Sequence, residues 1–454
     1  MSDESMTSQE PLQPLFAFSV TAEPVCLFRG EITLCWEGER HTSEAEVVLK
    51  LAPKPRISVE SEISGLPASA INLLVNHLPG MTYSLEGQEI QGFVQNFDFN
   101  FDNHAKLYIS LGAEPFQVLG DMQARASASS IFHLFNFPDF LGKSEYAIPL
   151  PAGYRHIALQ DEQWQIVIQS LKETKKAANK ARQEGGYYLT HVGKLARIDG
   201  ANFSGDEANE QYHLAANFLS FVQGSRCWPV CIAGLDENGS MSWQTWASPP
   251  ASTPAQSWFD LHHSIQAEQL FPLFSKRWNQ SESWRDCLRS AIYWYIQSNT
   301  SGGVPGIDAA IILAQSALER LAHHYLVIDR KMISAEGFRK LWVSDQLRLL
   351  FSSLRIPIEI TDDIPEIKKV ADHLKWKDVP QALTEVRNAL VHPENRNKER
   401  IRNCYVDTWR LSLWYVELSV LALCGYEGTY GNRLKKQRVG EVENMPWGAE
   451  GKLA

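Results

Sequence analysis

The chain has 454 residues, which is too long for one ordinary domain and suits two or three. Its composition, 44% hydrophobic and 21% charged, is that of a folded soluble protein, and no apolar run is long enough to cross a bilayer. The net charge of -10 argues against a surface that binds nucleic acid throughout, so any such contact must be local. The acidic N-terminus lacks the features of a secretory signal, and the dispersed cysteines make a poor disulfide framework, so we expect a cytoplasmic protein.

Residues 1–14 are polar, and we expect them to be disordered. From residue 15 to about 150 the pattern is strand-like, with alternating and continuous apolar runs separated by Gly, Pro and Asn. These runs predict a β-rich, sandwich-like domain or a twisted antiparallel sheet. The expected strands are Phe16–Val20, Glu31–Trp36, Glu44–Leu51, Phe93–Phe101 and Lys106–Leu111.

Residues 151–279 have a mixed pattern, which predicts an α/β domain or an extension of the N-terminal region. The expected elements are a helix over Gln163–Gln183 that is basic in its second half and stops at Gly185, a strand over Tyr187–Ile198 kinked at Gly193, a helix over Asp206–Gln223, a strand over Trp228–Gly234 and a loop over Ser248–Ser257.

Residues 280–433 are almost wholly helical in pattern, and 434–454 are expected to form a flexible tail. The predicted fold class is therefore a multidomain chain, with a β-rich or mixed α+β N-terminal region followed by an all-α bundle. The expected helices are Trp284–Ser298, Ala309–Tyr325 with Asp308 as N-cap, Gly337–Leu354, Ile364–Trp376, Val379–His392, and Lys398–Cys424 with Gly425 as its stop.

A polar cluster suited to chemistry lies between Glu385 and Pro393. Residues four apart share a helix face, so Asn388 and His392 align, while Arg387 stands about 100° away, within reach of its long side chain. Pro393 disfavours helical geometry at the preceding residue, so we expect the helix to end at His392. A histidine that moves protons near neutral pH and an arginine that binds phosphate oxygens suit RNA cleavage, and this scheme requires no metal.

The segment Arg387-Asn-Ala-Leu-Val-His392 resembles the motif of HEPN domains, in which an arginine and a polar residue precede a histidine by a short spacer. With Ala314–Leu321 before the motif and Leu423–Arg433 after it, the wider stretch is similar to the Apea-like HEPN subfamily. The resemblance covers about residues 284–433. The N-terminal part is similar in general texture to the sheet-rich regions that precede this domain in ApeA-type proteins.

The resemblance implies a HEPN bundle over residues 280–433 and a metal-independent endoribonuclease without cofactors, which leaves a 2′,3′-cyclic phosphate and a 5′-hydroxyl. Arg387, His392 and Asn388 would be catalytic, and Glu319 would orient Arg387 or His392. It further implies a homodimer or higher homo-oligomer formed through the bundle, and an RNA substrate, with transfer RNA among the candidates. The expected role is abortive antiviral defence, in which residues 15–150 would sense a phage-derived trigger. No membrane partner is expected.

Plainer alternatives remain open for these residues. Arg387 and His392 would be structural if the bundle were a catalytically silent scaffold for dimerisation or nucleotide binding. Glu319 would equally suit an intrahelical pairing with Arg320 or His323.

The basic residues that follow the motif would either guide the RNA backbone or form a solvated helix start; they are Arg396, Lys398, Arg400 and Arg402. A third hypothesis places an independent enzyme in residues 15–279, where the sequence shows no nucleophile elbow, phosphate loop or metal cluster.

Overall fold

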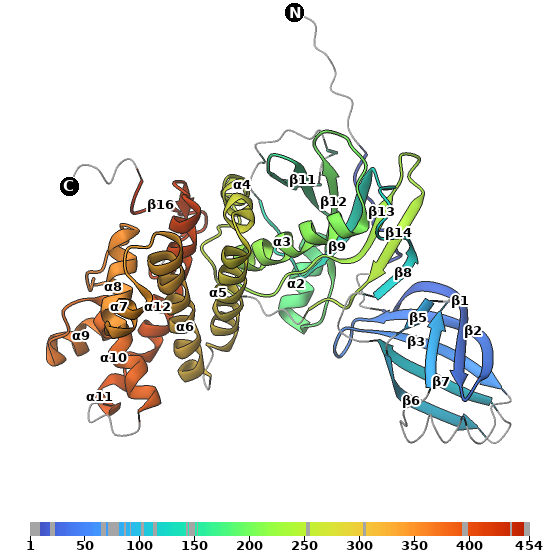
Figure 1. Ribbon diagram of the computed structural model, residues 1–454, viewed down its shortest axis with the longest axis horizontal. Coiled ribbons are helices and arrows are strands. Elements are labelled where there is room, and N and C mark those ends of the chain that lie inside the picture. Colours follow the sequence, from blue (N-terminus) through green and yellow to red (C-terminus); the bar gives the residue numbers. More distant parts are fainter. Residues whose placement is uncertain are drawn as a thin grey trace, which may run out of the picture.

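A β-rich N-terminal region precedes a mostly helical C-terminal region, as the sequence predicts (Figure 1). The computed structural model describes residues 10–448, apart from gaps at 19–22, 65–69, 71–80, 86–87, 91, 101–103, 112–115, 142–143, 145–149, 152, 251–254, 303–305, 393–397 and 436–437. The first sheet lies at one end of the molecule, the second sheet in the middle and the helices at the other end (Figure 1).

The first sheet contains seven antiparallel strands among the described residues, in the order β5-β4-β1-β2-β3-β7-β6. Alternate residues of β1 face the core, because successive side chains of a strand point to opposite faces; Ile32, Leu34 and Trp36 are buried. Glu37 and Gly38 turn the chain with φ of 46° and 86°, the left-handed pair that a two-residue hairpin requires. The strands are β1 (Val25–Trp36), β2 (Glu39–Lys50), β3 (Arg56–Ser64), β4 (Met81–Leu85), β5 (Gln88–Ile90), β6 (Gly92–Asn100) and β7 (His104–Leu111).

The second sheet has the order β10-β11-β12-β9-β13-β14-β8. β8 and β9 belong to this sheet, so the two sheets divide before residue 116, within the range 15–150 that the sequence predicts to be β-rich. The strands are β8 (Phe116–Gly120), β9 (Ser129–Phe135), β10 (His156–Gln160), β11 (Trp164–Ser170), β12 (Leu189–Arg197), β13 (Val230–Leu235) and β14 (Met241–Trp246).

Two helices accompany this sheet, α2 (Thr174–Glu184) and α3 (Gly205–Gln223). α3 begins with a capping box between Ser204 and Glu207 and ends at left-handed Gly224, as its sequence favours. α2 ends at Gly185 as predicted.

Several predictions for the N-terminal half differ from the structure. The single helix over Gln163–Gln183 is instead strand β11 followed by α2. Gly193 does not kink its strand; a Cβ there would lie 2.0 Å from the Phe132 ring, so the glycine permits close packing. Residues 1–9 of the segment that we expected to be disordered lie outside the described residues; in the described part of that segment, the Leu12 amide donates to Oε1 of Gln169 at 3.0 Å. Of the expected strand Phe16–Val20, residues 19–20 lie outside the described residues and the rest forms no strand.

The C-terminal helices differ from the prediction in where some of them begin and in where the chain interrupts them. The predicted helices over Gly337–Leu354 and Lys398–Cys424 are each divided in two, and Gly306 rather than Asp308 precedes the second helix. Gly425, left-handed at φ 78°, ends the last helix as expected. The helices are α4 (Ile265–Asn279), α5 (Glu282–Ser301), α6 (Ile307–His323), the π-helix η1 (His324–Asp329), α7 (Ala335–Lys340), α8 (Val343–Ser353), α9 (Pro365–Leu374), α10 (Val379–Val391), α11 (Lys398–Arg402) and α12 (Tyr405–Cys424).

The segment expected to be a flexible tail packs against the helices over its described residues. β15 (Thr429–Tyr430) pairs with β16 (Glu443–Asn444), and Met445 is buried. One continuous apolar core runs from a face of the second sheet through α3 and α4 into the bundle. A second core joins the first sheet to the other face of the second sheet. The second sheet therefore connects the first sheet to the helices.

Candidate functional site

The candidate site lies at the C-terminal end of α10, which packs against α6, α8 and α12. Asp378 begins the helix: its carboxylate accepts the Gln381 amide at 3.0 Å and binds Arg348 of α8, with Nε 2.6 Å from Oδ2. Val386 and Ala389 are buried against the bundle. The helix start and one face are thus fixed, which holds the last turn in a defined orientation.

α10 ends at His392, as the sequence predicts. The backbone leaves the helix there, with φ -109° and ψ 110°, and the His392 amide donates to the Asn388 carbonyl at 2.9 Å. This is the conformation that a following proline favours. The His392 side chain is exposed, so the imidazole is accessible to a substrate.

Arg387 and Asn388 lie one turn before the end of α10 and are half-buried. The Arg387 Nη1 is 3.4 Å from the Asn388 Oδ1, a long hydrogen bond. In the described part of the chain, no carboxylate lies within 4.0 Å of Arg387. No described carboxylate therefore occupies the guanidinium, and a phosphate would suit its paired donors.

Glu319 lies on α6, the helix that neighbours α10, but it does not pair with the motif. It is half-buried and accepts a hydrogen bond from Nε2 of Gln315 at 3.1 Å. Among the described residues no ion pair joins Glu319 to Arg387, His392, Arg320 or His323. The structure thus gives it neither the orienting contact nor the intrahelical ion pairs considered from the sequence.

The basic residues after the motif are only partly described. Arg396 lies outside the described residues, and Lys398 and Arg400 belong to the short helix α11. Arg402 ends α11 and its side chain is exposed. α11 packs against α10, so the helix that carries Lys398, Arg400 and Arg402 lies next to the candidate site.

Sequence reasoning missed a buried ion pair in the same helical region. Arg433 and Glu417 have side chains 2% and 0% exposed, and the Arg433 Nε lies 2.9 Å from a Glu417 oxygen. The Tyr295 hydroxyl donates to the same carboxylate at 2.6 Å. Glu417 is the one charged residue in the apolar stretch of α12 from Leu411 to Cys424, and this was the signal that would have predicted a buried partner.

Cys227 and Cys231, which lie four residues apart in the sequence, do not build a site. Burial raises the pKa of the Cys231 thiol to about 12 and moves the pKa of Cys227 in the same direction, so neither is a ready nucleophile or metal ligand. Across the described residues no group of three His, Cys, Asp or Glu side chains could hold a metal ion. No described helix is both long and apolar enough to span a membrane.

Two family models match the chain. The YopA central domain matches residues 122–257 and the YopA C-terminal domain matches residues 281–444, the range that contains every candidate site residue. The chain is 25% identical, over 451 residues, to the SPbeta prophage-derived uncharacterized protein YopA of Bacillus subtilis (strain 168). The aligned region covers 94% of this chain and 95% of that protein. No solved structure matches.

Proposed function

We propose that the protein is an endoribonuclease whose reaction takes place at the end of α10. The observation that carries the proposal is the grouping of an exposed His392, an Arg387 without a carboxylate partner among the described residues and the amide of Asn388 at one helix end. The resemblance of this segment to the HEPN motif adds the reaction class, a metal-independent cleavage.

In the proposed reaction the 2′-oxygen of a ribose attacks the adjacent phosphorus. The new 2′-O–P bond forms as the bond from phosphorus to the 5′-oxygen breaks, which leaves a 2′,3′-cyclic phosphate and a 5′-hydroxyl. His392 transfers a proton, from the 2′-hydroxyl or to the departing 5′-oxygen. Arg387 stabilises the negative charge that builds on the non-bridging oxygens, and Asn388 positions the phosphate.

A second copy of the chain would supply the second proton-transfer group. One exposed histidine serves one of the two proton transfers at a time, so two α10 ends that face each other would complete the site. Val391, beside His392, is an apolar side chain that is 37% exposed, and a second copy would cover it. We therefore propose a homodimer formed through the helical region.

The proposed biological role is antiviral defence in the cytoplasm, with the sheets as the region that senses a trigger. This role rests on the HEPN resemblance. The relative is itself prophage-derived. The direct contact of the second sheet with the helices, through one shared core, provides a physical route between the sensing and cleaving regions.

The proposal is tested by expressing the wild type beside His392→Ala and Arg387→Ala and mapping cuts in total RNA. We expect new 2′,3′-cyclic phosphate ends only with the wild type. Matched controls are His373→Ala and Arg339→Ala, which remove an exposed histidine and an exposed arginine from other helices of the same region and should leave cleavage unchanged.

Cleavage by both α10 variants at the wild-type level would disprove the assignment of this site. The absence of cleavage by a folded wild-type dimer on all cellular RNA would favour the silent scaffold instead.

A further inference from the structure

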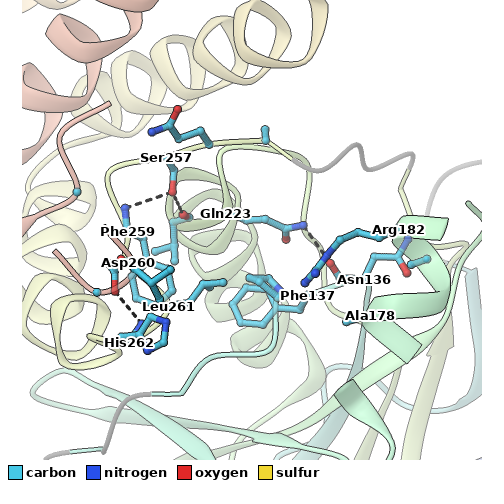
Figure 2. Close-up of a pocket in the computed structure, with 18 of the residues that line it drawn as sticks. Asn136, Phe137, Ala178, Arg182, Gln223, Ser257, Phe259, Asp260, Leu261 and His262 are labelled. Atoms are coloured by element: carbon cyan, nitrogen blue, oxygen red, sulfur yellow. Dashed lines mark hydrogen bonds between the residues drawn. The ribbon is translucent and has the colours of Figure 1, made fainter. Parts of the chain in front are cut away.

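A cavity of about 600 Å³ lies away from α10, where the second sheet region meets the C-terminal segment (Figure 2). Its volume is that of pockets for small ligands. Five parts of the chain line it: the loop after β9, the end of α2, the end of α3, residues 255–262 and the segment of Gly431, Val439 and Gly440. A ligand here would therefore contact both the second sheet region and the segment that follows the last helix.

One side of the cavity carries a positive charge without a partner. Arg182, in the last turn of α2, extends toward Asn136 and Phe137 (Figure 2). Its side chain is exposed, and within the described residues it forms no ion pair or hydrogen bond. The guanidinium can therefore bind a phosphate group that enters the cavity.

The other side of the cavity carries polar groups of a different kind. Asp260 and His262 lie across the view of Figure 2 from Arg182. Oδ1 of Asp260 accepts the His262 amide at 2.8 Å, which fixes the carboxylate. A carboxylate accepts N–H groups, such as those on the edge of a nucleobase.

The wall between these two sides is apolar and includes the rings of Phe137 and Phe259, with Leu261 beside them. Hydrogen bonds hold the wall in place. The Asn136 Nδ2 donates to the Gly186 carbonyl at 2.9 Å, and the Gln223 Nε2 donates to the Asn136 carbonyl at 3.2 Å. A preformed apolar wall with polar groups at its two ends suits a flat ring that carries a charged group.

The cavity also shares a wall with the buried ion pair of the helices. The carbonyl of Gln256, a lining residue, accepts hydrogen bonds from Arg433 Nη2 and Asn299 Nδ2, both at 2.8 Å. The amide of Gly431, another lining residue, donates to the Trp258 carbonyl at 2.6 Å. A ligand that contacts residues 255–262 would therefore touch a segment that is hydrogen-bonded to groups held by α5 and α12.

We propose that this cavity binds a mononucleotide, with Arg182 at the phosphate, Phe137 and Phe259 along the base, and Asp260 at the edge of the base. The inference does not depend on the ribonuclease proposal, because it concerns a different site and is tested by binding alone.

The test is isothermal titration calorimetry of the full-length protein with AMP, GMP, CMP and UMP, with the matching nucleosides and with inorganic phosphate. At least one mononucleotide should bind, and its nucleoside and inorganic phosphate should each bind at least tenfold more weakly. Arg182→Ala should weaken the mononucleotide at least tenfold and leave the nucleoside unchanged. Asp260→Asn should change the preference among the four bases. Lys175→Ala, an exposed lysine on the same helix that does not line the cavity, is the matched control and should bind as the wild type does.

The proposal is overturned if no mononucleotide binds, or if Arg182→Ala binds it as tightly as the wild type. It is also overturned if inorganic phosphate alone binds as tightly as the nucleotide, because the cavity would then be a simple anion site.

Discussion

Two arginines in the helical region, Arg433 and Arg387, have opposite surroundings. Arg433 is 2% exposed and neutralised by Glu417, with further hydrogen bonds to Asn299 and to the Gln256 carbonyl. Arg387 is half-buried on α10 and has only the long contact with Asn388. A buried cation must be paired, because removing it from water costs several kcal/mol. An unpaired cation at a helix end contributes little to stability and remains available to a ligand.

The comparison predicts that replacing the two arginines changes the free energy of unfolding by very different amounts. Arg433→Met leaves the buried Glu417 charge uncompensated, and we expect the free energy of unfolding to fall by about 3–5 kcal/mol. Arg387→Met should change it by less than about 1 kcal/mol, because methionine keeps the packing of the half-buried stem and only the long contact with Asn388 is lost. Chemical denaturation of both variants measures the difference.

The double variant Arg433→Met with Glu417→Leu should recover much of the loss, because no unpaired charge remains. Equal stability of the two single variants would contradict the comparison.

A buried histidine makes the stability of the protein depend on pH. His133 in β9 is fully buried; its Nδ1 lies 3.0 Å from the Cys231 carbonyl, and its Nε2 accepts the Leu15 amide. Burial lowers the pKa of His133 to about 4. Its unfolded pKa of about 6.5 is higher, so the unfolded state binds the proton first and stability falls as the pH drops from about 6.5 to 4, by about 3 kcal/mol.

His133→Gln should lower the slope of stability against pH in this range in denaturation measurements; part of the slope should remain, because burial also lowers the pKa of His191, to about 3. A His133→Gln variant with the wild-type acid slope would show that His133 is not held neutral.

Asn388 sharpens the account of the site itself. If its amide positions the phosphate, Asn388→Ala should slow RNA cleavage about tenfold, the value of one hydrogen bond of about 1.4 kcal/mol. Stability should change little because the contact that the Asn388 side chain makes with Arg387 is long, at 3.4 Å. Single-turnover cleavage rates give the measurement. An unchanged rate would mean that Asn388 contacts Arg387 but does not position the phosphate.

The smallest expected effect is at Arg402, which is exposed at the end of α11. If it contacts the RNA backbone, Arg402→Ala should weaken RNA binding by less than about tenfold and lower the slope of log affinity against log salt by about 0.7. Arg339→Ala, on α7, is the control. An unchanged slope would mean that Arg402 lies on a solvated surface that does not contact RNA.

The sequence predicted that a β-rich region precedes a helical region, and it predicted several helix ends. It did not predict the points at which two of the expected helices are divided. Ser204, Glu207 and Gly425 fix helix ends through local hydrogen bonds and backbone conformation, so local sequence suffices there. β11 was mistaken for a helix because its alternating buried residues run directly into the basic α2. α4 was missed; it carries Pro272 inside its span, which weakens a helical prediction.

For the candidate site, the sequence predicted the helix end at His392 because Pro393 acts on its immediate neighbour. It could not predict that Glu319 binds Gln315 rather than Arg387. That outcome depends on how α6 and α10 rotate against each other, which packing of the whole bundle determines. The pairing of Arg433 with Glu417 likewise depends on the return of the C-terminal segment onto α12.

The most direct test of the site is cleavage of one labelled oligoribonucleotide by purified wild type and His392→Ala, with a chelator present and product masses measured. The account predicts wild-type cleavage to a 2′,3′-cyclic phosphate and a 5′-hydroxyl, no cleavage when the attacking 2′-hydroxyl is replaced by hydrogen, and at least about a hundredfold slower cleavage by the folded variant. A variant that cuts at the wild-type rate would contradict it.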